Sequence, residues 1–250
     1  SSYLRAARAR YVARLKRVVA ESGMVQLSVV GGDDWSTRGI NVDDIVDMID
    51  ESKEAIASMG PAWKRSWLLS ARAAARDLPI ADLTFDPDSP AVVNLVKAFT
   101  DTITETQAAA VRTIVEEGLA SGAGVGTMQE QLALIEIIED DIKRSKLFEP
   151  SRALRIARTE ATRSVNLGTI NAYEEVAALG LTVEKVWLTA GEGERHPSYP
   201  GLDGQVRALD QDFDLNGVPS AYPGGSGNPG EDINCRCTTS PKVTGGDPLF

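Results

Sequence analysis

The feature that most constrains the fold of this chain is a change of hydrophobic pattern near residue 180. Before it, apolar residues recur mainly every three or four positions, as on one face of an amphipathic helix. After it, residues 182–188 alternate as strand residues do, and glycine or proline fills 14 of the 45 positions from 190 to 234. So many breakers leave room only for short strands joined by turns. The sequence therefore predicts an α+β protein, mostly helical over 1–149, with a small, loop-rich α+β domain over 150–250.

The first part is predicted to be a series of helices separated by turns. Asn41, Thr127 and Ser151 are placed to cap the first turns of three of them. The last long helix is expected to end at Gly180, and a closing strand to begin at Cys237. Breaks are predicted where glycine or proline interrupts the apolar pattern, at Gly60-Pro61, Phe85–Pro90, Gly118 and the glycines at 122, 124 and 126.

The first 20 residues carry six cations and no acid, so the other 230 residues must sum to −16 to give the net charge of −10. On a helix, most of these cations lie opposite an apolar stripe that includes Leu4, Tyr11 and Leu15. Two interpretations stay open: the helix docks its stripe on its own domain, or its cations contact an acidic protein surface or a phosphate backbone. The candidate contact residues are Arg5, Arg8, Arg10, Arg14, Lys16 and Arg17.

An acidic run follows, with six carboxylates between Asp43 and Glu54. Charges at this spacing are typical of the solvated face of a helix, which we prefer to a metal site. Trp63 and Trp67 are four residues apart and therefore share a helix face, where core packing is the expected role.

Composition excludes several kinds of chemistry. One histidine and two cysteines rule out a three-histidine zinc site, a four-cysteine zinc finger and paired-histidine phosphotransfer. No apolar run reaches the ~18 residues of a membrane span, so we expect no membrane association. Cys235 and Cys237 are too close in sequence for an easy disulfide, and we expect them to be reduced. The net charge of −10 argues against wrapping of nucleic acid over the whole surface.

Several short signatures follow one another in the C-terminal part: Arg158-Thr159-Glu160 on a helix, Trp187 on a strand, Arg195 and His196, Leu202-Asp203-Gly204, and Asn234-Cys235-Arg236-Cys237. In this order they resemble the C-terminal domain of the phage Mu F-like minor head proteins, over roughly 90 residues. One position departs from the family pattern. Tyr199 stands where the family has a histidine before the Leu-Asp-Gly segment, and His196 lies three residues earlier.

Two interpretations of these signature residues are weighed. His196, Cys235 and Cys237 could hold zinc, with Asp203 or water as a fourth ligand. The alternative that we prefer places the cysteines in a small core, with Asn234 and Arg236 bonding loop backbone. Likewise Arg158 and Glu160 could be catalytic, but we expect them to lock the helix to the loops through charge-assisted hydrogen bonds. No cofactor is predicted.

The resemblance implies a minor structural protein of a tailed phage head. Such a protein would be made in the bacterial cytoplasm and built in several copies into the capsid interior at the portal vertex, where it assists head assembly and genome delivery. Its partners would be portal or major capsid protein, and packaged double-stranded DNA. The alternative is an ADP-ribosyltransferase-like or zinc-dependent enzyme or toxin domain. Against it, we expect the C-terminal part to have neither a Ser-Thr-Ser segment nor a paired-glutamate loop of the kind that such chemistry uses, and no Gly-x-Ser-x-Gly turn is present. We therefore predict a protein without enzymatic activity.

Overall fold

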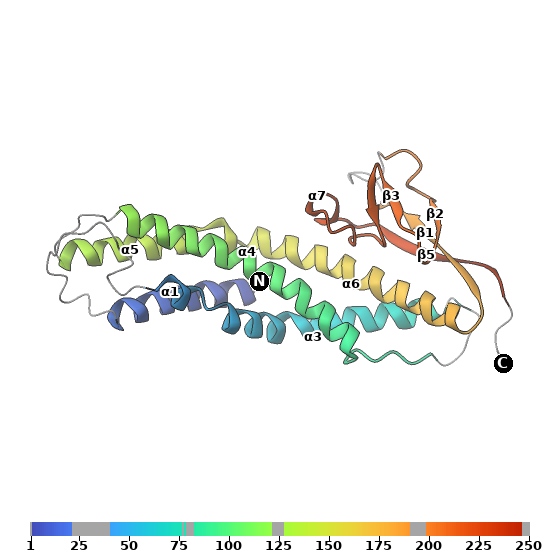
Figure 1. The fold of residues 1–250 in the computed structure, drawn as a ribbon, viewed down its shortest axis with the longest axis horizontal. Coiled ribbons are helices and arrows are strands. Elements are labelled where there is room, and N and C mark those ends of the chain that lie inside the picture. The colour runs from blue at the N-terminus through green and yellow to red at the C-terminus, as the bar shows by residue number, and fades with distance from the viewer. Residues whose placement is uncertain are drawn as a thin grey trace. The chain divides into compact units, whose positions relative to one another are not determined.

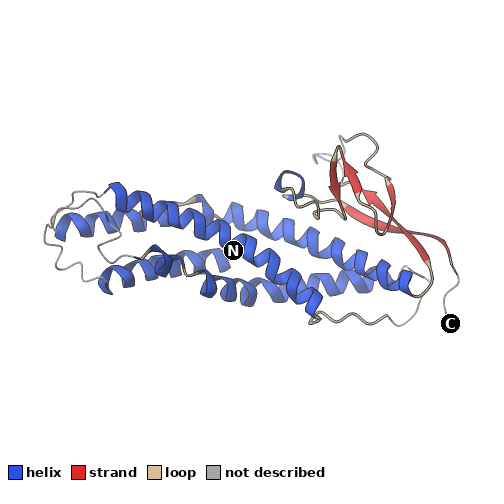
Figure 2. Ribbon diagram, in the orientation of Figure 1, coloured by secondary structure: helices blue, strands red, loops and turns tan. Residues whose placement is uncertain are grey.

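The structure, a computed structural model, describes residues 2–21, 41–76, 78, 83–121, 128–190 and 199–246. Long helices occupy most of the chain before residue 179, and all strands of the described residues come after it (Figures 1 and 2). The predicted α+β class, with a helical first half and a small sheet-containing C-terminal part, is confirmed. In the described residues no helix combines the length and the apolar character needed to cross a membrane.

The chain forms two compact units, and the first comprises residues 1–59 and 97–153. It contains α1 (Ser2–Glu21), α2 (Val42–Val46), the start of α3 (Met48–Arg76), most of α4 (Pro90–Ser121), α5 (Met128–Arg144) and the 3-10 turn η3 (Lys146–Phe148). Helix α1 packs against α2, α5 and η3. The apolar stripe of α1 lies in the core of this unit, where Tyr11 and Leu15 are fully buried. Of the two interpretations left open for α1, the docking of its apolar stripe on its own unit is therefore observed, while a partner contact of its cations stays a prediction.

The second unit comprises residues 60–96 and 154–250. It contains the rest of α3, most of α6 (Pro150–Ala178), and the short helix α7 (Pro229–Asp232). Its three-stranded antiparallel sheet has the order β2-β1-β5, and β3 and β4 form a separate hairpin. The strands are β1 (Thr182–Leu188), β2 (Val206–Ala208), β3 (Phe213–Leu215), β4 (Val218–Ser220) and β5 (Thr238–Gly245).

Two apolar clusters hold the second unit together. One joins Ala74 of α3 to Tyr173 and Val176 of α6 and Val183 of β1. The other surrounds Trp187. Helices α3 and α6 approach closely at Gly168, because any Cβ there would overlap the carbonyl oxygen of Trp67. Trp63 and Trp67 are 5% and 4% exposed, so the predicted core role of both tryptophans is confirmed.

The predicted break at Gly60-Pro61 is wrong, because α3 runs through Pro61 without interruption. A proline inside a helix removes one backbone hydrogen bond, at a cost of about 3 kcal/mol. Here Ala55 is buried before the proline, and Trp63 and Trp67 are buried after it. Burial of α3 on both sides of the proline, in each of the two units, outweighs the local cost. The boundary between the two compact units nevertheless falls at this position, between Met59 and Gly60.

Other predicted boundaries shift for local reasons. Helix α4 continues past Gly118, where any Cβ would overlap Ile138 of α5, so this glycine serves helix packing rather than helix termination. Helix α6 begins at Pro150 and not after Ser151, as expected for a proline in the first turn. Asn41 caps α2 as predicted, since its side chain accepts from the Asp43 amide. The glycines at 122–126 and Thr127 lie outside the described residues.

Candidate functional site

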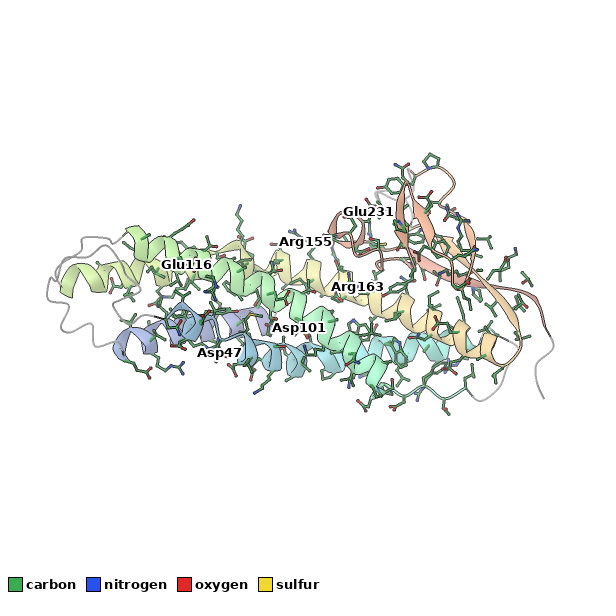
Figure 3. The ribbon with its side chains drawn as sticks, in the orientation of Figure 1. Asp47, Asp101, Glu116, Arg155, Arg163 and Glu231 are labelled. Atoms are coloured by element: carbon green, nitrogen blue, oxygen red, sulfur yellow. The ribbon has the colours of Figure 1, made fainter. Side chains whose placement is uncertain are left out.

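The side chains on one face of α6 bond to the loop between β4 and β5, and Arg163 is the main one (Figure 3). Its Nε donates to the carbonyl oxygen of Gly224 at 2.9 Å. Its Nη1 donates to Glu160 Oε1 at 2.8 Å, and its Nη2 lies 3.5 Å from Asp232 Oδ2. One guanidinium therefore joins the helix, a loop carbonyl and a buried carboxylate, and its fork of donors suits that task.

Asn166 forms the second connection between α6 and the same loop. Its Nδ2 donates to the carbonyl oxygens of Pro223 at 3.2 Å and Cys237 at 3.0 Å, and its Oδ1 accepts from the Thr239 amide at 3.1 Å. This buried amide thus serves two loop carbonyls and one backbone amide at the start of β5.

Asp232 organises the loop from within. Its Oδ1 accepts from the Ser226 amide at 3.0 Å and from the Ser226 hydroxyl at 2.7 Å. Its Oδ2 accepts from the Gly227 amide at 2.9 Å. The side chain of Asp232 is only 4% exposed, so its charge is compensated by these donors and by Arg163.

Burial sets the electrostatics of this cluster. Desolvation raises the pKa of Glu160 above its usual value, although Arg163 and the indole of Trp63 act in the opposite direction. Burial likewise raises the pKa of Tyr222, which lies in the field of the same charges. Asp232 and the Oε1 atom of Glu160 accept hydrogen bonds from donors of the protein itself. The arrangement is suited to holding loops in place, because a catalytic acid must also reach a substrate.

Lys185 supports the sheet from inside the second unit. It is 1% exposed, and its Nζ donates to the carbonyl oxygens of Leu209 at 3.0 Å and Ala221 at 2.9 Å. The ammonium also lies 5.2 Å from the centre of the Phe213 ring. Desolvation lowers the pKa of Lys185 from its ordinary value. The sequence pattern indicates that Lys185 is buried, because it lies between Val183 and Trp187 on the inward-facing side of an alternating strand.

The signature residues around Trp187 have structural roles. Trp187 is fully buried and meets Phe213 edge to face at 5.1 Å. Leu202 is fully buried in the same cluster. Asp203 accepts from the amide and hydroxyl of Thr189 at 2.8 and 3.0 Å, and these bonds lower its pKa. Gly204, at φ +73°, donates its amide to the Trp187 carbonyl at 2.8 Å, so the Leu-Asp-Gly segment is a turn closed onto β1.

The terminal Asn-Cys-Arg-Cys signature alternates in burial. Cys235 and Cys237 form no disulfide, each is 2% exposed, and both pack in the Trp187 cluster, whereas Arg236 between them is exposed. Asn234 adopts a left-handed backbone conformation, with φ +61°, and its amide donates to the Thr159 hydroxyl at 3.0 Å. Within the described residues, no group of three histidine, cysteine or carboxylate side chains is placed to hold a metal. Arg195 and His196 lie outside the described residues, so zinc binding through His196 stays a prediction.

The expected lock between α6 and the loops exists, but Arg163 and Asn166 form it and Arg158 does not. Arg158 is exposed and has no hydrogen bond or ion pair within the part of the chain that the structure describes. It lies five residues before Arg163, about 140° away around the helix. Glu160 lies on the correct face and contacts Arg163. Sequence reasoning chose the motif residues and missed the positions that share the loop-facing side of α6.

The cations of α1 are largely engaged inside the first unit. Arg10 and Arg14 each donate to Glu51, which is fully buried, at 2.8 Å, and Arg14 also pairs with Asp50. Arg14 is itself buried. The expectation of a solvated acidic face is thus wrong for Glu51, because two arginines of α1 cover it. The other α1 cations are Lys16, paired with Glu139 of α5, Arg8, bonded to the Lys143 carbonyl, and the exposed Arg5 and Arg17.

The sequence of the segment that contains α6 and the sheet matches a known family. The sequence pattern of the family described as "Phage Mu protein F like protein" matches residues 109–240, which is more than half of the chain. The chain belongs to this family. The match includes α5, α6, β1 to β4 and the start of β5. It also includes the residues that hold the loops, namely Arg163, Asn166, Lys185 and Asp232. Membership in the Mu F-like family supports a role in phage head morphogenesis.

A comparison with curated proteins finds a relative of a different description. An NAD(+)–arginine ADP-ribosyltransferase EFV of Enterococcus faecalis is 39% identical over 97 residues, which are 39% of this chain and 20% of that protein. The chain thus spans about a fifth of this relative. No solved structure matches the chain.

Proposed function

We propose that this protein is a minor structural protein of a tailed phage head, placed at the portal vertex inside the capsid, where it assists head assembly and genome delivery. The observation that carries the proposal is the match of the Mu F-like family pattern to residues 109–240. The hydrogen bonds that hold the loops support it. Their side chains bond to the protein's own backbone and charges, as seen for Arg163, Asn166, Lys185 and Asp232. Several copies in each head would follow from a place beside the portal ring.

In this proposal α1 presents the contact to portal or major capsid protein. The structure reduces the candidate residues on α1 to those that are exposed and lack an internal carboxylate partner. Arg5 and Arg17 meet this description within the described residues, whereas Arg10, Arg14 and Lys16 are paired.

Crosslinking in assembled particles tests this placement. A photo-crosslinking amino acid is introduced at Arg5 or Arg17, and at the exposed Glu117 of α4 as a control in the same unit. We expect crosslinks from the α1 positions to portal or capsid protein, and fewer from Glu117. Absence of the chain from purified heads would refute the proposed function, and its presence without a portal neighbour would refute only the portal placement.

The Enterococcus relative is the reason to test a second candidate, ADP-ribosyl transfer. The expectation that the C-terminal part lacks the paired glutamates of such chemistry is wrong, because Glu192 and Glu194 form a Glu-x-Glu pair in the sequence. This pair lies outside the described residues. We expect no label on the protein or on an arginine-rich acceptor after incubation with labelled NAD. A signal that disappears in the double variant Glu192→Gln/Glu194→Gln, but survives in Glu160→Gln, would establish an enzyme and contradict the non-enzymatic proposal.

Metal content decides the zinc alternative. We expect less than about 0.2 equivalents of zinc in protein purified without chelator, because both thiols are packed in an apolar cluster. About one equivalent that is lost in His196→Ala would assign His196, Cys235 and Cys237 to a metal site.

A further inference from the structure

The second half of α3 carries a row of exposed arginines, which we call the α3 arginine stripe: Arg65, Arg72 and Arg76. Their spacing of seven and four residues places them on one face of the helix. The opposite face carries the buried Trp63, Trp67 and Ala71. The stripe therefore faces away from the core of its own unit, and Leu69, 57% exposed, lies within it.

Within the described residues, the stripe has no internal counterion. None of its three guanidinium groups forms a hydrogen bond or an ion pair in the described portion of the chain. Residues 60–76 contain four cations and no acid, and the fourth cation, Lys64, has its own partner in Asp88 at 2.7 Å. In a chain of net charge −10, the α3 arginine stripe is a positive segment without a carboxylate partner among the described residues.

The geometry points to a polyanion, and we propose that the α3 arginine stripe binds the phosphate backbone of duplex DNA. With a rise of about 1.5 Å per residue, the three arginines extend over about 16 Å of helix. A duplex presents one phosphate charge per about 1.7 Å of its axis, so a stripe of that length faces several phosphates. Guanidinium forks suit phosphate oxygens. The inference rests on the proposed place inside the head, where packaged DNA is the abundant polyanion.

This assignment differs from the sequence-based expectation, which placed the DNA contact on α1. Two of the six α1 cations are bound to the buried Glu51, and a third is paired with Glu139. An arginine that already neutralises a buried carboxylate releases few counterions when DNA approaches. The stripe retains all three charges for an external partner. An acidic protein surface is the competing occupant, and it would also use the exposed Leu69.

The test is a salt titration of the full chain with a labelled duplex of about 25 base pairs, between about 25 and 200 mM salt. Each phosphate contact contributes about −0.9 to the slope of log K against log salt. We expect the triple variant Arg65→Ala/Arg72→Ala/Arg76→Ala to reduce the magnitude of that slope by between two and three, and to weaken binding at least tenfold at low salt. The matched control, Arg5→Ala/Arg17→Ala, removes two exposed arginines of α1 and should change the slope by less than one. Circular dichroism checks the fold of each variant.

Two results would overturn the inference: no binding of the wild-type chain at low salt, or an unchanged slope in the triple variant. Leu69→Gln gives an independent measurement that changes no charge. It should leave DNA affinity within about twofold, whereas a loss of head-protein binding in both Leu69→Gln and the triple variant, without a DNA effect, would assign the stripe to an acidic protein instead. A wild-type chain that enters heads but does not bind DNA refutes this inference and leaves the proposed function intact.

Discussion

Glu51 in the first unit and Asn166 in the second are both buried, but their hydrogen-bond partners differ in kind. Glu51 is bonded by two arginine side chains that come from another helix. Asn166 serves three backbone groups, two carbonyls of a loop and one amide at the start of β5. The same contrast holds for Lys185, which donates to two backbone carbonyls, and Asp232, which accepts from two backbone amides.

The difference follows from what each backbone leaves unpaired. A helix bonds its own amides and carbonyls, so a buried charge between helices finds partners only among side chains. The loop-rich unit has few ladder hydrogen bonds, so its buried polar side chains are needed by the backbone. Charge therefore fixes helix pairing in the first unit, whereas polar side chains fix loop conformation in the second.

The largest expected effect is on the helix-pairing side of this comparison. Glu51→Ala leaves Arg10 and Arg14 without their buried partner and should lower the free energy of unfolding by about 3 kcal/mol, because breaking a buried ion pair strands its charge. Chemical denaturation measures it. The control is Glu54→Ala. The Glu54 side chain is 51% exposed and pairs with Arg10 at the longer distance of 3.6 Å, so the expected loss in the free energy of unfolding is below about 0.5 kcal/mol. Equal losses would show that the buried pair is not what joins α1 to α3.

The next effect is on the loop-fixing side. Asn166→Ala removes the partners of two carbonyls and one amide, and should cost about 2 kcal/mol. Faster hydrogen exchange at the Thr239 amide should accompany it, since that amide donates to Asn166 Oδ1. Asn166→Asp keeps this acceptor and loses the donors. Hydrogen exchange at the Thr239 amide should therefore accelerate less in Asn166→Asp than in Asn166→Ala. Asn94→Ala, at an exposed position of α4, serves as the surface control.

A smaller loss of the free energy of unfolding is expected for Lys185→Met. This substitution keeps the length of the side chain but leaves the Leu209 and Ala221 carbonyls without their hydrogen-bond donor. The expected cost is about 1–2 kcal/mol near neutral pH. Because burial lowers the pKa of Lys185 below its ordinary 10.5, the folded state binds its proton less tightly than the unfolded state. Wild-type stability, taken relative to the methionine variant, should therefore fall as pH drops from 10.5 through the lowered pKa. A pH-independent difference would contradict this charge state.

The smallest effect concerns Glu160. Burial raises its pKa above 4.5, so the folded state binds that proton more tightly than the unfolded state. The stabilisation is fully present below pH 4.5 and is lost as pH rises through the raised pKa. Wild type should lose stability relative to Glu160→Gln over this interval, by less than about 1 kcal/mol, because Arg163 opposes the shift. Thermal unfolding of both proteins from pH 4 to 7 measures the difference; parallel curves would contradict it.

Much of the architecture follows from local sequence. Periodicity and breakers correctly predict the amphipathic helix at the N-terminus, the turn before Pro90, the end of α6 just before Gly180 and the strand at 182–188. Predictions failed where tertiary contacts changed the meaning of a residue. Pro61 remains inside α3 because α3 is buried both before and after it, and Gly118 remains inside α4 because Ile138 occupies the space of a side chain.

The candidate site was predictable only in part. The motif order located the right helix, strand and turn, and Trp187, Leu202 and the cysteines lie in one cluster. It did not indicate that Arg163 holds the loop while Arg158 faces solvent, since both are arginines on the same helix. Which arginine meets the loop depends on the rotation of α6 in its unit, and no local pattern encodes that rotation.

Sequence alone determined the class of the protein, its helices and the order of its family motifs, because hydrophobic period and turn residues act over a few neighbours. Tertiary structure decided which charges are used internally and which remain for partners. Arg14 and Arg72 look alike in the sequence, yet one is buried against Glu51 and the other is exposed on α3. The physical reason is that the state of a charge depends on groups brought near it from distant parts of the chain.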